Sequence, residues 1–305
     1  MNVPILTDAF NLPGVRLDPD RLLRLRYLPS RAPASTATRY APTPGQIATR
    51  RRGYGIEIDE IRVWVPGDDT RHLDRNATAR TGVPHVRTFR DERQRNVLLV
   101  ADFRPSMLFG TKRAFRSVAA AEALAFVGWR VIDEGGRVGL LTAGTDDPVF
   151  VRPAQGERAM KTVIAGMARA HRKALESHDV QEPRLEEFIE LGARCLPRGG
   201  ALVLATALEQ TGASFERIAR SLARRGALRI ILVSDAFEHA PPPGFYPFIT
   251  PEGHRAQGAI DRSRNASSGD TRLSDLRDLG VLAVRLDAEL EPENNASLLH
   301  RLVIS

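Results

Sequence analysis

The sequence predicts a doubly wound α/β fold with a mostly parallel sheet, preceded by a small N-terminal extension that contains β-structure. Three observations predict it: apolar runs of strand length, a long apolar helix directly after the first run, and a regular alternation of the two kinds of segment from residue 96 onward. Strands that alternate with helices favour a parallel sheet with right-handed crossovers.

The first strand is expected at Asn96–Asp102, a continuous apolar run that ends in an acid, as is typical of a central strand covered on both faces. A helix from Lys112 to about Glu134, with Thr111 as its N-cap, is apolar on nearly all sides and should pack against the sheet. The other strands are expected at 137–142, 149–151, 201–205, 229–233 and 281–284, and the other helices at 157–171, 183–195, 214–225 and 295–303.

The domain organisation predicted from composition has three parts. Residues 1–45 are an Arg- and Pro-rich segment, residues 46–95 a β-containing region, and residues 96–305 the α/β domain. Short apolar patches such as Leu22-Leu23 are candidates for packing on the body, but residues 1–40 offer little apolar surface and are expected to be dispensable for folding. Residues 238–278 are expected to form a long excursion at one end of the sheet.

The chain is basic, with 44 Lys and Arg against 37 Asp and Glu and a net charge of +7. A basic balance raises an arginine-mediated nucleic-acid or membrane-surface binder as an alternative function. All but three of the basic residues are arginine, which fits the codon bias of a GC-rich genome equally well. The single cysteine, Cys195, fits a reducing compartment, and no apolar run reaches membrane-spanning length, so a cytoplasmic protein is expected.

Sequence motifs of the common enzyme classes do not occur in the chain. It contains no G-x-S-x-G elbow, P-loop, G-x-G-x-x-G fingerprint or H-E-x-x-H pair. His171, His178 and Cys195 lie within 25 residues of one another but lack ligand spacing, so they predict a solvated surface and a half-buried thiol. The expectation is a protein that is not an enzyme and has no cofactor.

Acids and arginines alternate around the Pro66-Gly67 turn. This density predicts a bidentate ion-pair network that ties residues 46–95 onto the α/β body, with a partner-contact surface as the alternative. Its expected members are Arg62, Asp68, Asp69, Arg71, Asp74 and Arg80.

Three blocks of residues carry a resemblance to a known family. They run from RGYG at 52–55 to Ala79-Arg80-Thr81, from Phe89 to Thr111, and from Ser234 to Phe245. The pattern resembles the family catalogued as domain of unknown function 58, whose members resemble von Willebrand factor A domains and are commonly encoded beside MoxR-type AAA+ ATPases. The resemblance implies a von Willebrand factor A (Rossmann-like) domain, and an adaptor that binds a MoxR-type ATPase and a client protein.

Many von Willebrand factor A domains hold a divalent cation through a D-x-S-x-S motif, a threonine and a later aspartate. Here Asp102 and Ser106 match, Arg104 stands where the first serine would be, and Ala207 stands in place of the second acid. A hard cation needs about six oxygen ligands, so Mg²⁺ is not expected.

Arg104 is instead expected to point outward and offer its guanidinium to a carboxylate of a protein partner, with Asp102 and Ser106 beside it. Two alternatives stay open for this loop. In the first, Asp102 and Ser106 only hydrogen-bond the loop backbone. In the second, the loops above Asp102 serve a metal-dependent hydrolase.

Overall fold

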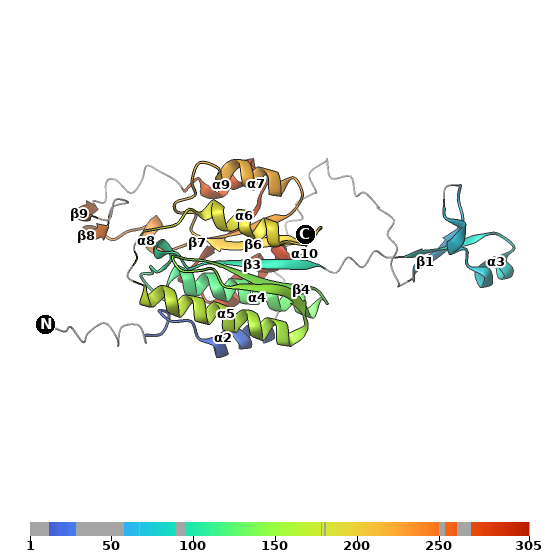
Figure 1. The fold of residues 1–305 in the computed structure, drawn as a ribbon, viewed down its shortest axis with the longest axis horizontal. Helices are drawn as coiled ribbons and strands as arrows, with labels where there is room; N and C mark the ends of the chain where they lie inside the picture. Colours follow the sequence, from blue (N-terminus) through green and yellow to red (C-terminus); the bar gives the residue numbers. More distant parts are fainter. Residues whose placement is uncertain are drawn as a thin grey trace. The chain divides into compact units, whose positions relative to one another are not determined.

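The computed structural model describes residues 12–28, 58–66, 68–89, 95–177, 179, 181–249, 254–260 and 270–304. By the contacts among its residues the chain divides into two compact units, one of residues 1–34 with 95–305 and one of residues 35–94. The first unit holds a six-stranded sheet with its helices, and the second holds a two-stranded sheet (Figure 1).

The six-stranded sheet has the order β10-β7-β6-β3-β4-β5. Adjacent strands of the sheet run parallel, except that β5 is antiparallel to β4. The expected mostly parallel α/β architecture is therefore confirmed. The strands are β3 (Asn96–Asp102), β4 (Arg137–Ala143), β5 (Phe150–Gln155), β6 (Ala201–Thr206), β7 (Leu228–Ser234) and β10 (Leu282–Asp287).

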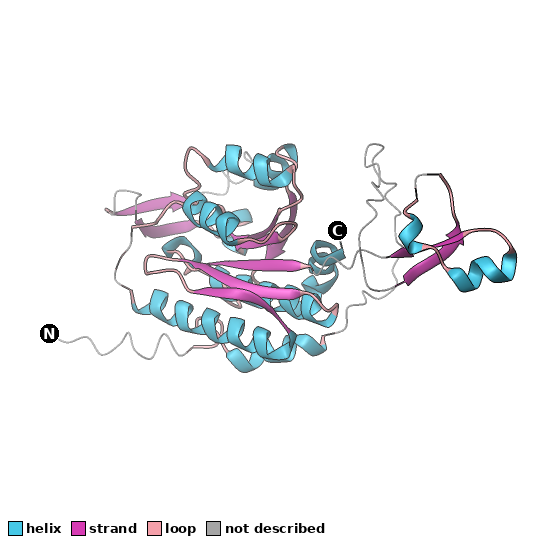
Figure 2. Ribbon diagram, turned by 45° about the vertical axis from the view of Figure 1, so that its right-hand side comes forward, coloured by secondary structure: helices cyan, strands magenta, loops and turns pink. Residues whose placement is uncertain are grey.

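Helices cover both faces of the sheet (Figures 1 and 2). Alternate strand residues point to opposite faces, so Leu99 belongs to one buried cluster and Leu98 to the other. One face packs against α4 (Arg116–Asp133), α5 (Gly156–Glu176) and α10 (Pro292–Ile304), and the other against α6 (Leu185–Cys195), α7 (Phe215–Ala223) and α9 (Arg272–Asp278). Among the described residues, no helix is both long and apolar enough to cross a membrane.

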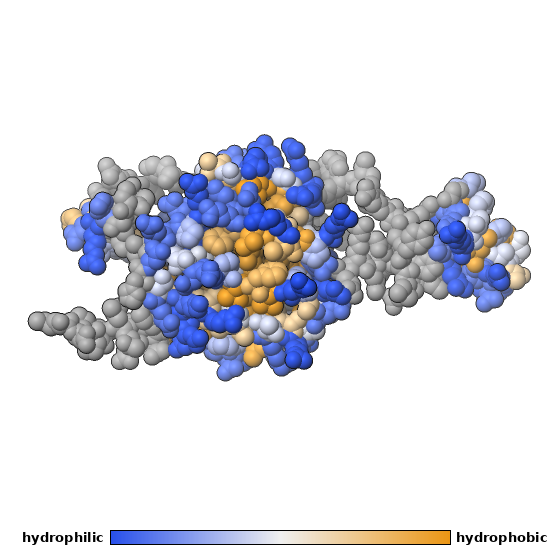
Figure 3. Space-filling model, in the orientation of Figure 1, coloured by the Kyte–Doolittle hydropathy of each residue, from blue (hydrophilic) through white to orange (hydrophobic). Residues whose placement is uncertain are grey.

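Apolar residues gather in the middle of one face of this unit, around α6 and the strands next to it (Figure 3). On α6 and just after it, Leu191, Ala193 and Leu196 are only partly buried against the core.

The sequence analysis expects a third strand at 149–151 without giving its direction, and the structure shows that direction. β5 pairs antiparallel with β4, with Leu141 opposite Phe150. Only six residues separate the two strands, which is too short for the helical crossover that a parallel pair requires. β5 therefore ends the sheet as the return strand of a hairpin.

The described residues 12–28 pack on the α/β unit, whereas the sequence analysis lists residues 1–45 as a separate segment. Asp18 caps the short helix α2 (Pro19–Arg24), and a 3₁₀ turn, η1 (Leu25–Tyr27), follows. Leu17, Leu22 and Leu25 are buried in the same cluster as α4. The indole N–H of Trp129 donates to the carbonyl of Leu22 at 3.0 Å. The sequence analysis names Leu22-Leu23 as a candidate for this packing, but it does not predict a core contribution, because leucines spaced by five and three residues match no strand or long-helix period.

The first long helix begins later than expected, and Thr111 does not cap it. α4 starts at Arg116, with Phe115 in the N-cap position and no side-chain cap. The hydroxyl and the backbone N–H of Thr111 donate to Asp235, 124 residues further along the chain. Local sequence rules assign Thr111 to the N-cap of α4, but in the structure its side chain makes a long-range hydrogen bond to Asp235 instead.

The expected excursion at 238–278 contains regular structure. A short helix, α8 (Ala236–His239), is followed by the antiparallel hairpin β8 (Gly244–Ile249) and β9 (Arg255–Ile260). α9 returns the chain to the sheet, where its Leu276 is buried.

The second unit contains β1 (Ile58–Val63) paired antiparallel with β2 (His85–Phe89), inside the region at 46–95 that the sequence predicts to contain β-structure. A 3₁₀ turn, η2 (Thr70–His72), and a helix, α3 (Arg75–Thr81), lie between them and are not predicted by the apolar pattern. Asp74 caps α3, and Gly82, with φ of 74°, ends it in the left-handed conformation that glycine favours. The motif residues 52–55 lie outside the described residues.

Candidate functional site

The carboxyl end of β3 carries a buried ion pair between Asp102 and Arg104. The Nε and Nη2 atoms of Arg104 donate to the two Asp102 oxygens, each at 2.9 Å. Thr206, at the end of the neighbouring strand β6, donates its hydroxyl to Asp102 Oδ2 at 2.6 Å. Both charged side chains have 0% exposure. Both oxygens of Asp102 accept hydrogen bonds from Arg104, and a bidentate arginine–carboxylate pair of this type is among the strongest hydrogen-bonded ion pairs in proteins.

The guanidinium of Arg104 also joins this pair to two other loops. Its Nη1 donates to the carbonyl of Pro183 at 2.8 Å, and its Nη2 donates to the carbonyl of Glu209 at 2.9 Å. Burial by itself would lower the pKa of Arg104, but the negative charges of Asp102 and Glu182 outweigh it and raise the pKa. Arg104 is therefore a permanent internal cation that links the ends of β3 and β6 to the start of α6.

The loop after β6 has an unusual backbone. Leu208 and Gln210 have φ values of 60° and 47°, in the left-handed region that residues other than glycine rarely adopt. Arg104 binds carbonyls within this loop, and Arg272 donates from Nη1 to the carbonyl of Ala207 at 2.8 Å. Two arginines thus stabilise a backbone that costs energy to hold.

The expectation that Arg104 points outward is wrong. Its side chain is fully buried, because the Asp102 carboxylate two residues earlier and the loop carbonyls draw it inward. The same contacts decide the Mg²⁺ question on chemical grounds. A hard cation would need the oxygens of Asp102, and a guanidinium already binds both of them. The residues at this loop do not fit a divalent cation.

Ser106 lies beside the buried pair and binds an acid that the sequence analysis did not select. Its backbone N–H donates to Glu182 Oε2 at 2.9 Å, and its hydroxyl donates to Oε1 at 2.5 Å. Nη1 of Arg104 lies 3.3 Å from the same Oε1. The predicted grouping of Asp102, Arg104 and Ser106 is therefore real, but a carboxylate of the chain itself occupies it.

A second polar network holds the loop after β7. Burial by itself would raise the pKa of Asp235, but hydrogen bonds from Thr111 and from the Phe237 N–H lower it. Glu238 accepts the backbone N–H of Asp235 at 2.6 Å, which completes a capping box at α8. The carboxylate of Glu238 also pairs with Arg116 and Arg272, each at 2.6 Å. These contacts bring α4, α8 and α9 together at the same end of the sheet.

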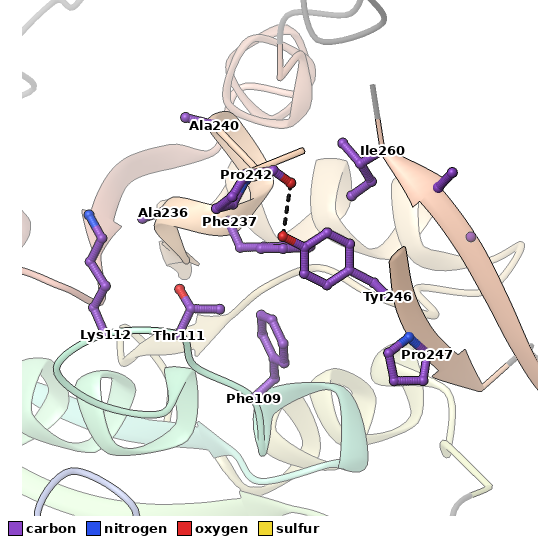
Figure 4. Close-up of a pocket in the computed structure, with 12 residues that line it drawn as sticks. Phe109, Thr111, Lys112, Ala236, Phe237, Ala240, Pro242, Tyr246, Pro247 and Ile260 are labelled. Atoms are coloured by element: carbon purple, nitrogen blue, oxygen red, sulfur yellow. Dashed lines mark hydrogen bonds between the residues drawn. The ribbon is translucent and has the colours of Figure 1, made fainter. Parts of the chain in front are cut away.

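A pocket of about 720 Å³ lies next to this network (Figure 4). The rings of Phe109 and Phe237 meet edge to face at 6.1 Å, and those of Phe237 and Tyr246 at 4.8 Å. The Tyr246 hydroxyl donates to the carbonyl of Pro242 at 2.8 Å, as the dashed line in Figure 4 shows. The other lining residues come from the loop before α4, from α8 and from the β8–β9 hairpin: Thr111, Lys112, Ala236, Ala240, Pro247, Gly258, Ala259 and Ile260.

The ion-pair network predicted in the second unit forms only in part. Arg62 and Asp68 make a bidentate pair, with both distances at 2.8 Å, and Asp74 pairs with Arg87 at 2.7 Å. Both pairs lie inside residues 35–94, whereas the prediction was a network reaching the α/β body. Arg87 was missed because it follows the motif at a distance, on β2 opposite α3.

Three expected members of that network have other surroundings. Asp69 caps η2 by accepting the N–H of Arg71 at 2.9 Å. The side chains of Arg71 and Arg80 are exposed and have no ion-pair partner among the described residues. Among the described residues, Arg62 pairs with Asp68, and Asp74 pairs with an arginine outside the predicted set. Arg71 lies on η2 and Arg80 on α3, two elements that the sequence analysis did not predict.

Two of the three histidine and cysteine residues selected from the sequence, His171 and Cys195, lie in the described part of the chain. His171 is fully buried, which corrects the expected surface position, and its Nε2 lies 2.9 Å from the hydroxyl of Ser117. Burial, with a smaller contribution from the positive charge of Arg16, lowers the pKa of His171 to about 4. Cys195 at the end of α6 is half-buried, as expected, and His178 lies outside the described residues.

Several residues of these clusters carry no signal in the sequence alone. Glu182, Thr206, Arg116 and Arg272 are separated by tens of residues and match no spacing rule. Their common feature is that each lies at or just beyond an end of a strand or helix near the carboxyl edge of the sheet, where parallel folds assemble their sites.

Comparison with known proteins finds relatives without an assigned activity. Uncharacterised proteins of Mycobacterium tuberculosis (Rv1480) and Mycobacterium bovis (Mb1516) are each 35% identical over 119 residues, which cover 38% of this chain and 37% of theirs. The match thus spans little more than a third of the length of these relatives.

Among solved structures, the conserved hypothetical protein BatB from Bacteroides thetaiotaomicron aligns with 69% of this chain and 100% of its own, at a TM-score of 0.40 and 15% identity. An uncharacterised membrane-spanning protein from Vibrio fischeri aligns with 68% of this chain and 96% of its own, at a TM-score of 0.19 and 18% identity. The sequence pattern described as "Protein of unknown function DUF58" matches residues 60–267, and the chain therefore belongs to this family.

Proposed function

We propose that this chain is a non-enzymatic adaptor that binds a protein partner through the aromatic pocket at the carboxyl edge of its sheet. The observation that carries the proposal is the pocket itself. Phe109, Phe237 and Tyr246 come from three separate segments and line about 720 Å³ of open, mainly apolar space. Aromatic side chains around a concave surface are typical of the centres of protein interfaces.

The polar groups near the pocket support binding rather than chemistry. Asp102, Arg104 and Arg272 are engaged in bidentate pairs and in contacts to loop carbonyls. A general acid or base needs a lone pair or a proton that is free for a substrate. The lone pairs and protons of these groups are engaged in hydrogen bonds that hold the loops. Their arrangement builds a rigid frame beside the pocket.

For the partner we propose a MoxR-type AAA+ ATPase, with a client protein presented to it in chaperone-like or complex-assembly work. This assignment rests on the resemblance of the motif blocks, as does the proposal that the α/β domain is of the von Willebrand factor A type. The arginine-rich composition gives less support to a nucleic-acid or membrane-surface binder, because Arg104, Arg116 and Arg272 serve internal ion pairs.

The test is co-purification of the full chain with the MoxR-type ATPase of its source organism, followed by measurement of their affinity. Phe237→Ala should weaken binding at least tenfold, because it removes the central ring of the pocket. Phe150→Ala is the matched control, since Phe150 is an exposed phenylalanine on β5 that does not line the pocket. Equal binding by both variants would reject the pocket, and no binding by the wild-type chain would reject the partner.

A further inference from the structure

Two hydrogen-bond donors and one cation at the carboxyl end of β3 converge on one carboxylate. The backbone N–H and the hydroxyl of Ser106 each bind one oxygen of Glu182, and Nη1 of Arg104 lies 3.3 Å from Oε1. Two parallel donors from one residue with a cation beside them match the shape of a carboxylate. The group is specific in chemistry as well as in geometry, because a neutral acceptor would lose the attraction of the guanidinium.

We propose that Ser106 and Arg104 form a binding site for an acidic side chain of a protein partner, and that Glu182 of this chain occupies the site until the partner displaces it. The proposal rests on the proposed adaptor function for the identity of the partner, but the carboxylate site itself stands on the contacts of Ser106, Arg104 and Glu182.

Glu182 is suited to leave. Residues 181–184 belong to no helix or strand, and α6 begins only at Leu185. The side chain of Glu182 is 12% exposed, so it lies at the rim of the site rather than in the core. Departure of Glu182 would break its contacts with Ser106 and Arg104. By contrast, Asp102 is fully buried and remains paired with Arg104.

Arg116 contacts both the Ser106 site and the aromatic pocket. This side chain donates from Nη1 to the carbonyl of Ser106 at 3.3 Å, and its guanidinium lies 5.1 Å from the centre of the Phe109 ring. The positive charge of Arg116 also offsets the negative charges of Glu209 and Glu238 beside it. A partner segment that carries an acidic residue next to an apolar one would therefore reach both the Ser106 site and the pocket.

An internal ligand reduces the apparent affinity for an external one. The partner binds only the fraction of molecules in which Glu182 has left, so its apparent dissociation constant rises by the inverse of that fraction. Glu182→Ala removes the internal competitor and leaves the two donors of Ser106 and the guanidinium of Arg104 in place. The variant should bind carboxylates that the wild-type chain does not bind detectably.

The first experiment uses sodium acetate as the probe and thermal melting as the readout. Glu182→Ala should melt lower than the wild type, and acetate at millimolar concentrations should raise its melting temperature in a saturable manner, relative to sodium chloride at equal ionic strength. The wild type should show no such rise. The matched control is Glu190→Ala, which removes an exposed glutamate of α6 that lies 3.8 Å from Arg217.

Acetamide, which has the same shape without the charge, should have no effect on Glu182→Ala. Adding Ser106→Ala should abolish the acetate effect. An acetate effect of equal size in the wild type, in Glu190→Ala or in the double variant would overturn the proposal. If Glu182→Ala does not fold, Glu182→Gln takes its place. Its neutral amide holds the donors less strongly, so acetate should displace it at higher concentration, and the absence of any effect there would overturn the proposal equally.

The second experiment measures affinity for the MoxR-type ATPase. Glu182→Ala should bind it about tenfold more tightly than the wild type, and acetate should compete with this gain. Acetate binding without any ATPase binding would reject the adaptor function and keep the carboxylate site. ATPase binding that is unchanged by Glu182→Ala would reject the role of the site in partner recognition.

Discussion

Arg104 lies only two residues after Asp102, yet its guanidinium turns back and binds both oxygens of that carboxylate at 2.9 Å. The backbone N–H of Arg104 donates to the same carboxylate at 3.1 Å. The guanidinium of Arg104 is therefore the cation that neutralises the Asp102 carboxylate at the carboxyl end of β3. It joins the ends of β3 and β6 to the segment before α6 through carbonyls of Pro183 and Glu209.

Arg104→Met should strongly destabilise the protein, because it leaves the Asp102 carboxylate buried without its partner. Loss of one member of a buried pair costs about 3–5 kcal/mol, which urea denaturation of the full chain would measure. Arg104→Lys should recover only part of this loss, since an ammonium cannot bind both oxygens and two loops at once. Arg71→Met is the control at an exposed arginine. Similar effects of Arg104→Met and the control would show that the pair is dispensable.

Leu22→Ala should reduce the free energy of unfolding by about 2–5 kcal/mol, the usual range for a buried leucine. Leu22 is 1% exposed and packs in the cluster that contains α4, whereas Tyr27, a few residues later, is 81% exposed. Tyr27→Ala should therefore have little effect in the same denaturation experiment. A chain lacking residues 1–28 that melts like the full chain would restore the expectation that the N-terminus is dispensable.

His171 should make the protein less stable as the pH falls from about 6.5 to 4. Its pKa is about 4 in the folded state, against an ordinary value of 6.5, so the unfolded chain binds a proton in this range and the folded chain does not. The stabilisation is complete above pH 6.5 and its loss is on the order of 3 kcal/mol.

The measurement compares the free energy of unfolding of the wild type and of His171→Gln between pH 7 and pH 4. Glutamine keeps a partner for the Ser117 hydroxyl but does not titrate. Since carboxylates titrate in the same range, the difference between the two proteins is the informative quantity. Parallel curves would mean that His171 is protonated equally in both states.

Asp74→Ala should destabilise α3 in the second unit. The Ala77 N–H and, next, the Arg87 side chain hold the pKa of Asp74 below its usual value, so both contacts favour the ionised acid. Amide hydrogen exchange of residues 75–81 in the full chain should become faster in Asp74→Ala and remain unchanged in Arg80→Ala. Asp74→Asn should fall between them, because asparagine keeps the N-cap but loses the ion pair. Faster exchange in Arg80→Ala would support the wider network that the sequence analysis predicted.

Most of the fold was predictable because it depends on short-range pattern. Continuous apolar runs such as Asn96–Asp102 identify strands buried on both faces, and their alternation with helices identifies the parallel sheet. The β5 direction and the start of α4 were missed for different reasons. The first depends on the length of a connection, and the second on a contact between Thr111 and Asp235 that no local rule contains.

The candidate site was predictable only as a location. Asp102, Arg104 and Ser106 were selected because they align with the D-x-S-x-S motif that the family resemblance implies, and the structure does bring them together. The direction of the Arg104 side chain could not be predicted, because it depends on carbonyls of Pro183 and Glu209, which lie 79 and 105 residues further along the chain.

The sequence by itself determined the α/β class, the order of most elements and the family, because hydrophobic periodicity and motif spacing are properties of neighbouring residues. The tertiary structure alone decided that Arg104 is buried and that Glu182 binds Ser106. It also decided that the leucines of residues 17–25 enter the core. The physical reason is that these contacts join residues far apart in the chain. Charged and apolar groups form such contacts only when the folded chain brings them together and excludes water from them.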